Sequence, residues 1–594
     1  MFGLILKFIL LFLILFGLAQ FLSYRLKIKS EFLPVTVLTG VGVIMFLAGL
    51  LNMMPEAVTL LTLFSFGSVG YIFLRERSLK NIFSPGLFFF LLGAAYLAYF
   101  LRGLQLEYYD DFSHWGLIVK EMLLTDRLPN FSSKMITFQA YPPGTAVVLY
   151  FTGKILGNTE SVMLFGQGLF YLSCITPLFA LIRKKQYLSW LLIVPATLYF
   201  LTGNLGVVAL SVDTLLSLLG LAGTAILVYL YREKRIEEAI LPLALITSYL
   251  NIVKNSGILF VFLLVGIYFV MIQKGTVQKK KAAVGGMAIV GIPVLFKFLW
   301  DKHVKLVFAD GASTKHAMSV ENYRNILGEK SLGDVKQITF DLLRSSVNIN
   351  SPEIKVLVVA LVAVAVIGTL KRMNHFTGIG ESDSDSSRIE KGLLLFMVGI
   401  YAAYQVGLWA TYIFSMPLAE AIVLASYNRY NITCIMYLLG VVLIYFLYEM
   451  ERMETKTMAL KATMVGISLA LMVSPLYWMN DSVKNLFVKK DYSAHYKTHL
   501  HNIIQANQLT DESAYIIYVG DYIGESSQDY LYYITCYELQ TRAVNVVTPD
   551  TVDLLGEFTS PVKFIVLRDD EKVKNKLKQY GIFEYGVDEV VQIN

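Results

Sequence analysis

The sequence predicts a polytopic α-helical membrane protein of about 14 spans with a small soluble α/β domain at its C-terminal end. Three observations lead to this fold class. Of the 594 residues, 56% are hydrophobic and 16% are charged, whereas a soluble globular protein carries about 25% charged residues. Apolar runs long enough to cross a bilayer recur along most of the chain. After Trp478 the composition changes to that of a soluble domain.

The composition also excludes several classes of protein. The net charge of +6 is modest, and the basic residues form short clusters between apolar runs, as loops of a membrane protein do, which argues against nucleic-acid binding. Three scattered cysteines, Cys174, Cys434 and Cys536, are too few for a disulfide framework or a Cys-rich metal site. The first apolar stretch lacks a small-residue cleavage site and is followed by basic residues, so we expect a membrane span rather than a signal peptide.

A helix needs about 17–25 apolar residues to cross the hydrocarbon core. The stretches that meet or approach this length are Phe2–Leu22, Phe32–Leu51, Ala57–Leu74, Ile82–Leu101, Ser161–Ile182, Tyr187–Leu201, Leu205–Leu230, Ala239–Val253, Ser256–Ile272, Ala282–Trp300, Val356–Leu370, Leu393–Phe414, Ile432–Leu447 and Met458–Tyr477.

The basic clusters predict the orientation, because Lys and Arg collect in cytoplasmic loops. With the spans above, every cluster falls on one side, expected to be the cytoplasm. The apolar stretch Tyr141–Leu156 would break this pattern if it spanned, so we expect it to dip into or lie along the outer leaflet. The clusters are Arg25/Lys27/Lys29, Arg75/Arg77/Lys80, Arg183/Lys184/Lys185, Arg232/Lys234/Arg235, Lys279/Lys280/Lys281, Lys371/Arg372 and Arg452/Lys456.

The chain therefore divides into a membrane domain, residues 1–480, and an extracytoplasmic α/β domain, residues 481–594. The membrane domain carries two large outer loops, residues 102–140 and 301–355. In the C-terminal domain, helix-like stretches alternate with expected strands, and no Gly-rich phosphate loop is present. The expected strands are Tyr515–Val519, Ala543–Val547, Val562–Leu567 and Glu589–Ile593.

The densest polar cluster beside the membrane is Glu107-Tyr-Tyr-Asp110-Asp111-Phe-Ser-His114-Trp115, directly after an expected span. Two adjacent carboxylates at a lipid boundary are costly unless they are solvated, paired or used. The alternative is that Asp111 caps a helix beginning near Ser113, with His114 completing the cap. A cap needs one carboxylate and leaves Asp110 unexplained.

Further ionisable residues are expected on the same outer face. Asp213 lies inside an otherwise apolar span, about two turns from its expected outer end, where an ionisable group is a functional candidate by default. Its alternative role is a structural hydrogen bond to a neighbouring helix. Lys254 sits at an outer turn, and Lys315, His316 and Arg429 are further outer cations. Each cation could instead snorkel to lipid headgroups.

The order of these features resembles the GT-C superfamily of integral membrane glycosyltransferases, which take sugars from polyprenyl-phosphate carriers. The resemblance rests on Asp110-Asp111-Phe-Ser-His114-Trp115, then Tyr141-Pro142-Pro143-Gly144, then Asp213, Lys254 and Arg429-Tyr430. It covers roughly residues 102–430 and the outer C-terminal domain, and it is specific in order rather than in any single motif. One departure is that three spans precede the span that leads into the acidic loop, whereas many members have none there.

The resemblance implies an inverting transfer of a sugar from a polyprenyl phosphate to an acceptor hydroxyl, in the assembly or modification of a cell-envelope glycan, lipid or protein. Asp110 would accept the hydroxyl proton, and the carrier phosphate would meet outer cations. The implied catalytic residues are Asp110, Asp111 and Asp213, and the implied substrate-binding residues are His114, Lys254, Lys315, His316 and Arg429. No cofactor is required, although Glu107, Asp110, Asp111 and Asp213 are oxygen ligands suited to Mg²⁺ or Mn²⁺.

Two other functions remain open. A transporter or flippase of a lipid-linked or anionic substrate places charges near the bilayer midplane and often shows internal repeats, whereas the polar candidates here gather at one face. A cell-envelope polymerase or ligase of another fold would share the lipid-linked substrate. In each case we expect a multi-pass protein of the plasma membrane.

Overall fold

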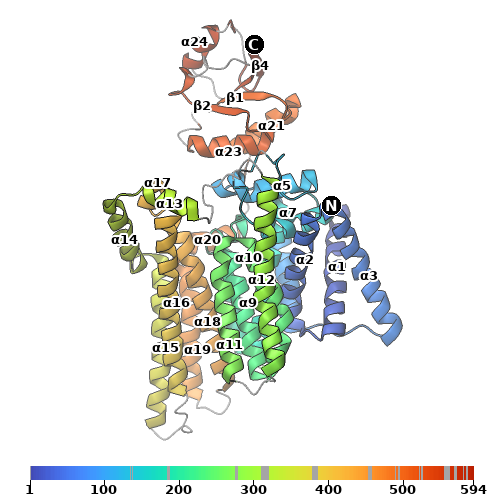
Figure 1. Ribbon diagram of the computed structural model, residues 1–594, viewed down its shortest axis with the longest axis vertical. Coiled ribbons are helices and arrows are strands. Elements are labelled where there is room, and N and C mark those ends of the chain that lie inside the picture. The colour runs from blue at the N-terminus through green and yellow to red at the C-terminus, as the bar shows by residue number, and fades with distance from the viewer. Residues whose placement is uncertain are drawn as a thin grey trace.

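The computed structural model describes residues 2–133, 135–136, 138–182, 187–274, 279–308, 320–376, 386–452, 458–488, 490–492, 495–520, 522, 526–553, 562–567, 571–579, 581–582 and 586–593. Within this part of the chain, eleven helices are long and apolar enough to cross a membrane, so the architecture is that of a polytopic helical membrane protein (Figure 1). A helix is present at each of the expected spans. Three of those helices offer only shorter apolar segments: Pro85–Phe100, Leu192–Val208 and Val465–Trp478.

The bundle is built from long apolar helices joined mostly by short connections. Its helices are α1 (Phe2–Leu26), α2 (Leu33–Leu50), α3 (Met54–Glu76), α4 (Pro85–Phe100), α7 (Glu160–Ile175), α8 (Tyr187–Thr202), α9 (Asp213–Arg232), α10 (Ile240–Val253), α11 (Ile258–Lys274), α12 (Lys279–Val307), α15 (Pro352–Phe376), α16 (Ser386–Phe414), α18 (Tyr427–Arg452) and α19 (Met458–Trp478). Shorter helices cover one end: α5 (Gly116–Thr125), α6 (Gly144–Leu156), α13 (Val320–Gly328), α14 (Leu332–Ser346), α17 (Leu418–Ile422) and α20 (Asn480–Asn485).

The two ends of the bundle differ in charge. At one end, basic residues lie over tyrosine rings of neighbouring helices: Lys29 lies over the Tyr229 ring at 5.2 Å, and Arg232 lies over the Tyr448 ring at 4.7 Å. The other end carries the C-terminal residues and is called the domain end below (Figure 1). The basic clusters that these contacts include therefore lie opposite the domain end, and the assignment of each end to a cellular compartment stays a prediction.

Helix α6 does not cross the bundle. At its start, the Tyr249 hydroxyl at the domain end of α10 donates to the Gly144 carbonyl at 2.6 Å. At its other end, Lys154 pairs with Asp126 at 2.9 Å, just after α5. Thirteen residues give a helix of about 20 Å, too short to span. The helix therefore lies in the domain-end half of the bundle, in line with the sequence-based expectation.

Helix α9 corrects the expected span 205–230. The helix begins only at Asp213, so this residue stands at a helix start rather than two turns inside the membrane. The preceding helix ends in a turn in which Asn204, Leu205 and Gly206 all adopt positive φ angles. Such angles break a right-handed helix. The apolar residues that follow, including Val207 and Leu210, are buried against protein, which gives them the same apolar signal as a lipid-facing run.

The C-terminal residues form a four-stranded sheet with strand order β2-β1-β3-β4, in which β1 is parallel to β2 and β3, and β4 is antiparallel to β3. We call residues 495–593 the C-terminal unit. Its elements are α21 (Tyr496–Asn507), β1 (Ala514–Tyr518), α23 (Gln528–Leu539), β2 (Val544–Val547), β3 (Val562–Val566), α24 (Glu571–Gln579) and β4 (Val590–Ile593). The strands lie within two residues of their expected positions.

Both faces of this sheet are covered by helices. Along β1, Tyr515 and Ile517 pack with residues of α21 and α23, whereas Ile516 and Tyr518 pack with Val573 of α24. Successive side chains of a strand point to opposite faces, so a strand buried on both faces is apolar throughout.

The C-terminal unit docks on the segment that follows α4. Lys120 donates to the Tyr537 carbonyl at 2.6 Å, and the Tyr530 hydroxyl donates to the Glu107 carbonyl at 2.5 Å. The ring of Phe112 meets the rings of Tyr530 and Tyr537 edge-on. Helix α23 thus packs against Glu107 and Phe112, on the side of this segment that faces away from the bundle (Figure 1).

Candidate active site

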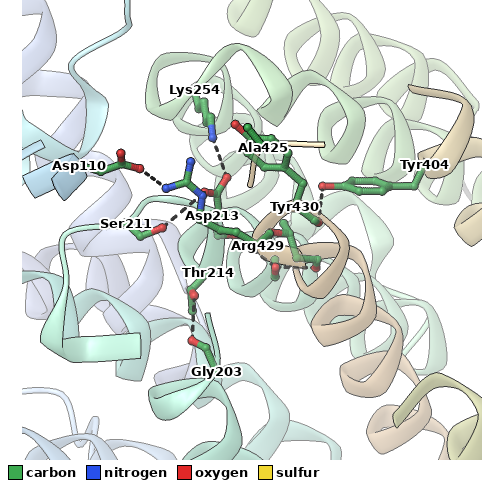
Figure 2. Close-up of polar contacts among 12 residues, drawn as sticks. Asp110, Gly203, Ser211, Asp213, Thr214, Lys254, Tyr404, Ala425, Arg429 and Tyr430 are labelled. Atoms are coloured by element: carbon green, nitrogen blue, oxygen red, sulfur yellow. Dashed lines mark hydrogen bonds and ion pairs between the residues drawn. The ribbon is translucent and has the colours of Figure 1, made fainter. Parts of the chain in front are cut away.

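Four charged side chains from four separate segments meet at the domain end of the bundle. Asp110 precedes a short π-helical turn, Asp111–Trp115, and Asp213 begins α9. Lys254 follows α10, and Arg429 lies in the first turn of α18. Figure 2 shows the Arg429 guanidinium between the two aspartates, with Lys254 approaching Asp213.

Asp213 is the hub of this ionic cluster, which we define as Asp110, Asp213, Lys254 and Arg429. Its Oδ1 accepts from Lys254 Nζ at 2.8 Å, and its Oδ2 lies 3.4 Å from Arg429 Nε. Arg429 Nη1 also pairs with Asp110 Oδ2. Two carboxylates and two cations give the cluster no net charge, which allows these charges to be buried together. The N-terminus of α9 further favours a carboxylate at position 213.

The cations do not snorkel independently to headgroups. The side chain of Lys254 is 15% exposed and that of Arg429 is 20% exposed, and both contact the same aspartate. Lys254 Nζ also lies 4.9 Å from the centre of the Tyr430 ring, and the Arg429 guanidinium lies 5.4 Å from it. Tyr430 thus forms an aromatic wall shared by both cations. Its backbone carbonyl accepts from the Tyr404 hydroxyl at 2.9 Å, which fixes this part of α18.

Asp111 is separated from its neighbour by burial. Its side chain is 1% exposed, and its Oδ1 accepts from the backbone N–H of Leu210 at 2.8 Å. Burial raises the pKa of Asp111 to about 8. Its Oδ2 meets no hydrogen-bond partner among the described residues. Asp111 therefore ties the acidic segment to the loop before Asp213. It does not cap the helix near Ser113, as the alternative supposed, because its hydrogen bond comes from Leu210 instead.

The loop before α9 is held by side chains of α7. The Gln167 amide donates to the Ala209 carbonyl at 2.5 Å, and the Tyr171 hydroxyl donates to the Ser211 carbonyl at 2.9 Å. The Ser211 hydroxyl in turn lies 3.4 Å from Asp213 Oδ2. Backbone carbonyls in an irregular segment need such donors inside a membrane protein, and these bonds fix the start of α9.

His114 is buried in an aromatic setting and lies outside the ionic cluster. Its ring centre is 4.5 Å from that of Trp115, 5.5 Å from Phe138 and 5.2 Å from Tyr141, each in edge-to-face geometry. Burial, aided by the charge of Lys254, lowers the pKa of His114 to about 3. The imidazole is therefore neutral near pH 7 and adds no positive charge to the site, and its role in substrate binding stays a prediction.

The four carboxylates expected to bind a metal do not form one group. Glu107 pairs with Lys490, and Asp110 and Asp213 are both engaged by Arg429. Within the described part of the chain, no group of three or more His, Cys, Asp or Glu residues is arranged to hold a metal ion. The two remaining predicted cations, Lys315 and His316, lie outside the described residues.

A second charged group, missed by the sequence reasoning, lies where the C-terminal unit meets the bundle. Lys497 of α21 is 4% exposed, pairs with Glu160 at the start of α7 and lies 4.0 Å from Glu538. Glu160 also accepts from the Leu106 N–H at 2.7 Å, close to the acidic segment. An acidic residue directly before a span was a visible signal for Glu160, but no local pattern links it to a lysine 337 residues later.

Comparisons of this chain with protein-family models, with curated proteins and with solved structures find no match. The function is therefore argued from the geometry of the ionic cluster.

Proposed function

We propose that this protein transfers a sugar from a polyprenyl-phosphate carrier to an acceptor hydroxyl at the domain end, outside the cytoplasm at the plasma membrane. The observation that carries the proposal is the convergence of two carboxylates and two cations, from segments as far apart as residues 110 and 429, in one buried cluster beside the membrane. Charged side chains that are buried together in protein are costly to desolvate, and such clusters are typical of functional sites.

Asp110 is the carboxylate suited to act as the base. Its side chain is 33% exposed, whereas Asp213 is 5% exposed and Asp111 is buried. The acceptor hydroxyl oxygen attacks the anomeric carbon and its proton passes to Asp110. The bond between the anomeric carbon and the phosphate oxygen breaks, and its electron pair stays on the carrier phosphate. A single displacement of this kind inverts the anomeric configuration.

The cations are suited to stabilise the leaving phosphate. The carrier changes from a phosphodiester with one negative charge to a monoester with about 1.5 to 2, so positive charge nearby favours the transition state over the bound donor. Arg429 presents five N–H donors and Lys254 presents three. The hydrogen bond from Arg429 to Asp110 is donated by Nη1, and the proposal assigns Nη2 to a phosphate oxygen while Asp213 keeps both cations in place.

Purified protein incubated with a panel of polyprenyl-phosphate sugars and hydroxyl acceptors tests this proposal by the release of polyprenyl phosphate. We expect release by the wild type and a loss of about 10²–10⁴-fold in Asp110→Asn, the contribution of a general base. Asp126→Asn is the matched control, because Asp126 lies near the same end and pairs with Lys154 outside the cluster.

Two results would contradict the proposal. Near-normal turnover by a folded Asp110→Asn protein would remove the proposed base. Movement of an intact lipid-linked sugar across proteoliposomes, without release of polyprenyl phosphate, would indicate the flippase instead.

A further inference from the structure

A pocket lies at the end of the bundle opposite the domain end, which we call the basic end. One wall of this pocket comes from residues 27–32, which join α1 to α2, and the other from residues 229–238, which join α9 to α10. Its volume is about 220 Å³. A molecule of liquid water occupies about 30 Å³, so the basic-end pocket has room for a polyatomic group.

The basic-end pocket has an apolar floor. Ile28, Phe32 and Leu230 line it and are buried. The ring of Phe32 meets the ring of Tyr229 edge-on, with the ring centres 5.6 Å apart, which fixes the two walls against each other. A floor of this kind contacts the carbon atoms of a ligand rather than its charge.

The rim of the basic-end pocket carries an excess of one positive charge. Lys29 Nζ lies 3.2 Å from Glu31 Oε2. Arg235 donates to both carboxylate oxygens of Glu238, from Nε at 2.6 Å and from Nη2 at 2.7 Å. Lys27 is exposed and forms no ion pair within the part of the chain that the structure describes. Three cations therefore face two carboxylates, and the charge of Lys27 is left over.

Lys27 stands where the backbone favours glycine. It follows the last turn of α1 with a φ of 54°, in the left-handed region, where glycine has no steric cost. A lysine near the C-terminal end of a helix also interacts favourably with the helix dipole. The same account applies to Lys234, which follows α9 with a φ of 56° and does not line the pocket. Lys234 can therefore separate a role in the pocket from a role at a helix end.

We infer that the basic-end pocket binds the headgroup of an anionic glycerophospholipid, with the phosphodiester at Lys27, Lys29 and Arg235 and the glycerol on the apolar floor. A phosphodiester carries one negative charge, which cancels the excess charge of the rim, whereas a phosphate monoester carries about 1.5 to 2 and would exceed it. Basic pockets between membrane helices are typical sites for such headgroups. Leu26, beside Lys27, is 47% exposed, so the acyl chains can follow the outer side of α1 into the bilayer. This inference is independent of the ionic cluster and of sugar transfer.

Native mass spectrometry of the full-length protein in detergent tests the inference, with phosphatidylglycerol as the probe. We expect one phosphatidylglycerol to bind about tenfold more tightly than phosphatidylcholine, whose choline group cancels the phosphate charge. Lys27→Gln should weaken the binding of phosphatidylglycerol by about tenfold, because a charge-assisted contact is lost, and Lys27→Arg should preserve it. Lys234→Gln is the matched control, with the same backbone conformation outside the pocket, and should weaken binding by no more than about threefold.

Lys27→Gly separates binding from folding. It removes the charge and suits the left-handed backbone, so the unfolding temperature should not fall, whereas the binding of phosphatidylglycerol should weaken as in Lys27→Gln. Unchanged binding in a folded Lys27→Gly protein would overturn the inference.

Four other results would overturn it as well. Equal binding of phosphatidylglycerol and phosphatidylcholine would remove the role of the charge. Equal losses in Lys27→Gln and Lys234→Gln would show a general attraction of anionic lipid to the basic end. Tighter binding of phosphatidic acid, a monoester, would contradict the charge of the rim. Glycerophosphoglycerol, the soluble headgroup without chains, separates the two sources of a phosphodiester, and competition by it at the same concentration as the intact lipid would remove the lipid as the ligand.

Discussion

The pairing of Lys254 with Asp213 predicts a strong energetic coupling that can be measured without any substrate. Removing either residue alone leaves an unbalanced charge in the ionic cluster. Lys254→Met leaves a net charge of −1 and Asp213→Asn a net charge of +1, because Asp110 and Arg429 neutralise each other. The double variant restores a neutral cluster that consists of the Asp110–Arg429 pair alone.

The structure sets the size of the effect. At the observed 2.8 Å between Nζ and Oδ1, the Coulomb attraction is about 6 kcal/mol for an effective dielectric constant of about 20. Desolvation offsets part of it, and breaking a buried pair by removing one partner costs about 3–5 kcal/mol. We therefore expect each single variant to lose about 3–5 kcal/mol of unfolding free energy. The double variant should lose about 2–3 kcal/mol less than the sum of the singles.

Reversible unfolding in mixed micelles, with the fraction of sodium dodecyl sulfate as the denaturing variable, gives the four free energies of this cycle. The exposed pair Arg235–Glu238, at 2.6 Å with side chains 50% and 37% exposed, is the control cycle and should couple by less than about 0.5 kcal/mol. If the Lys254 and Asp213 effects add within about 0.5 kcal/mol, the two residues do not share a buried ion pair and the cluster is wrong. The double variant also separates folding from function, because we expect it to fold and yet to fail in sugar transfer.

Three further predictions concern the parts around the cluster. Stability should fall as pH rises from about 6.5 to about 8, because Asp111 stays protonated in the folded state up to its raised pKa while the unfolded carboxyl is already ionised. Below about pH 6.5 the lowered pKa of His114 gives a slope of the opposite sign, because the unfolded imidazole binds a proton that the buried one does not. Asp111→Asn should remove the fall above about pH 6.5 in thermal melts, and an unchanged fall would contradict the assignment. Lys497→Met removes the cation that Glu160 and Glu538 share, and it should weaken docking of the C-terminal unit by about 3–5 kcal/mol. Hydrogen exchange over residues 107–120 should then be faster, whereas the control Lys578→Met, on the exposed side of α24, should leave the exchange rates unchanged. The three native cysteines are buried, so single introduced cysteines can report the orientation of the protein in the membrane. Ser331→Cys at the domain end should react with an impermeant maleimide in intact cells, and Ser78→Cys at the basic end should not. The reverse pattern would invert the predicted topology.

The amino-acid sequence alone predicts the helical membrane architecture and the positions of most helices and strands. These features depend on local properties, namely the length of an apolar run, the spacing of apolar residues along it and the change in composition after Trp478. The sequence also singled out Asp110, Asp213, Lys254 and Arg429 one by one, because a charge beside lipid is unusual wherever it occurs.

Which of these charges pair with one another depends on the packing of the helices. Asp110 and Asp111 are adjacent and chemically identical, yet one reaches Arg429 and the other is buried on the Leu210 N–H. Likewise Glu107, expected beside the other carboxylates, meets Lys490 instead. Such partners come from segments 99 to 383 residues away, so they depend on which helices pack side by side rather than on any local pattern. The start of α9 at Asp213 was likewise not predictable from local sequence. Apolar residues buried by protein and apolar residues facing lipid give the same sequence signal, so the apolar residues before Asp213 read as part of the span.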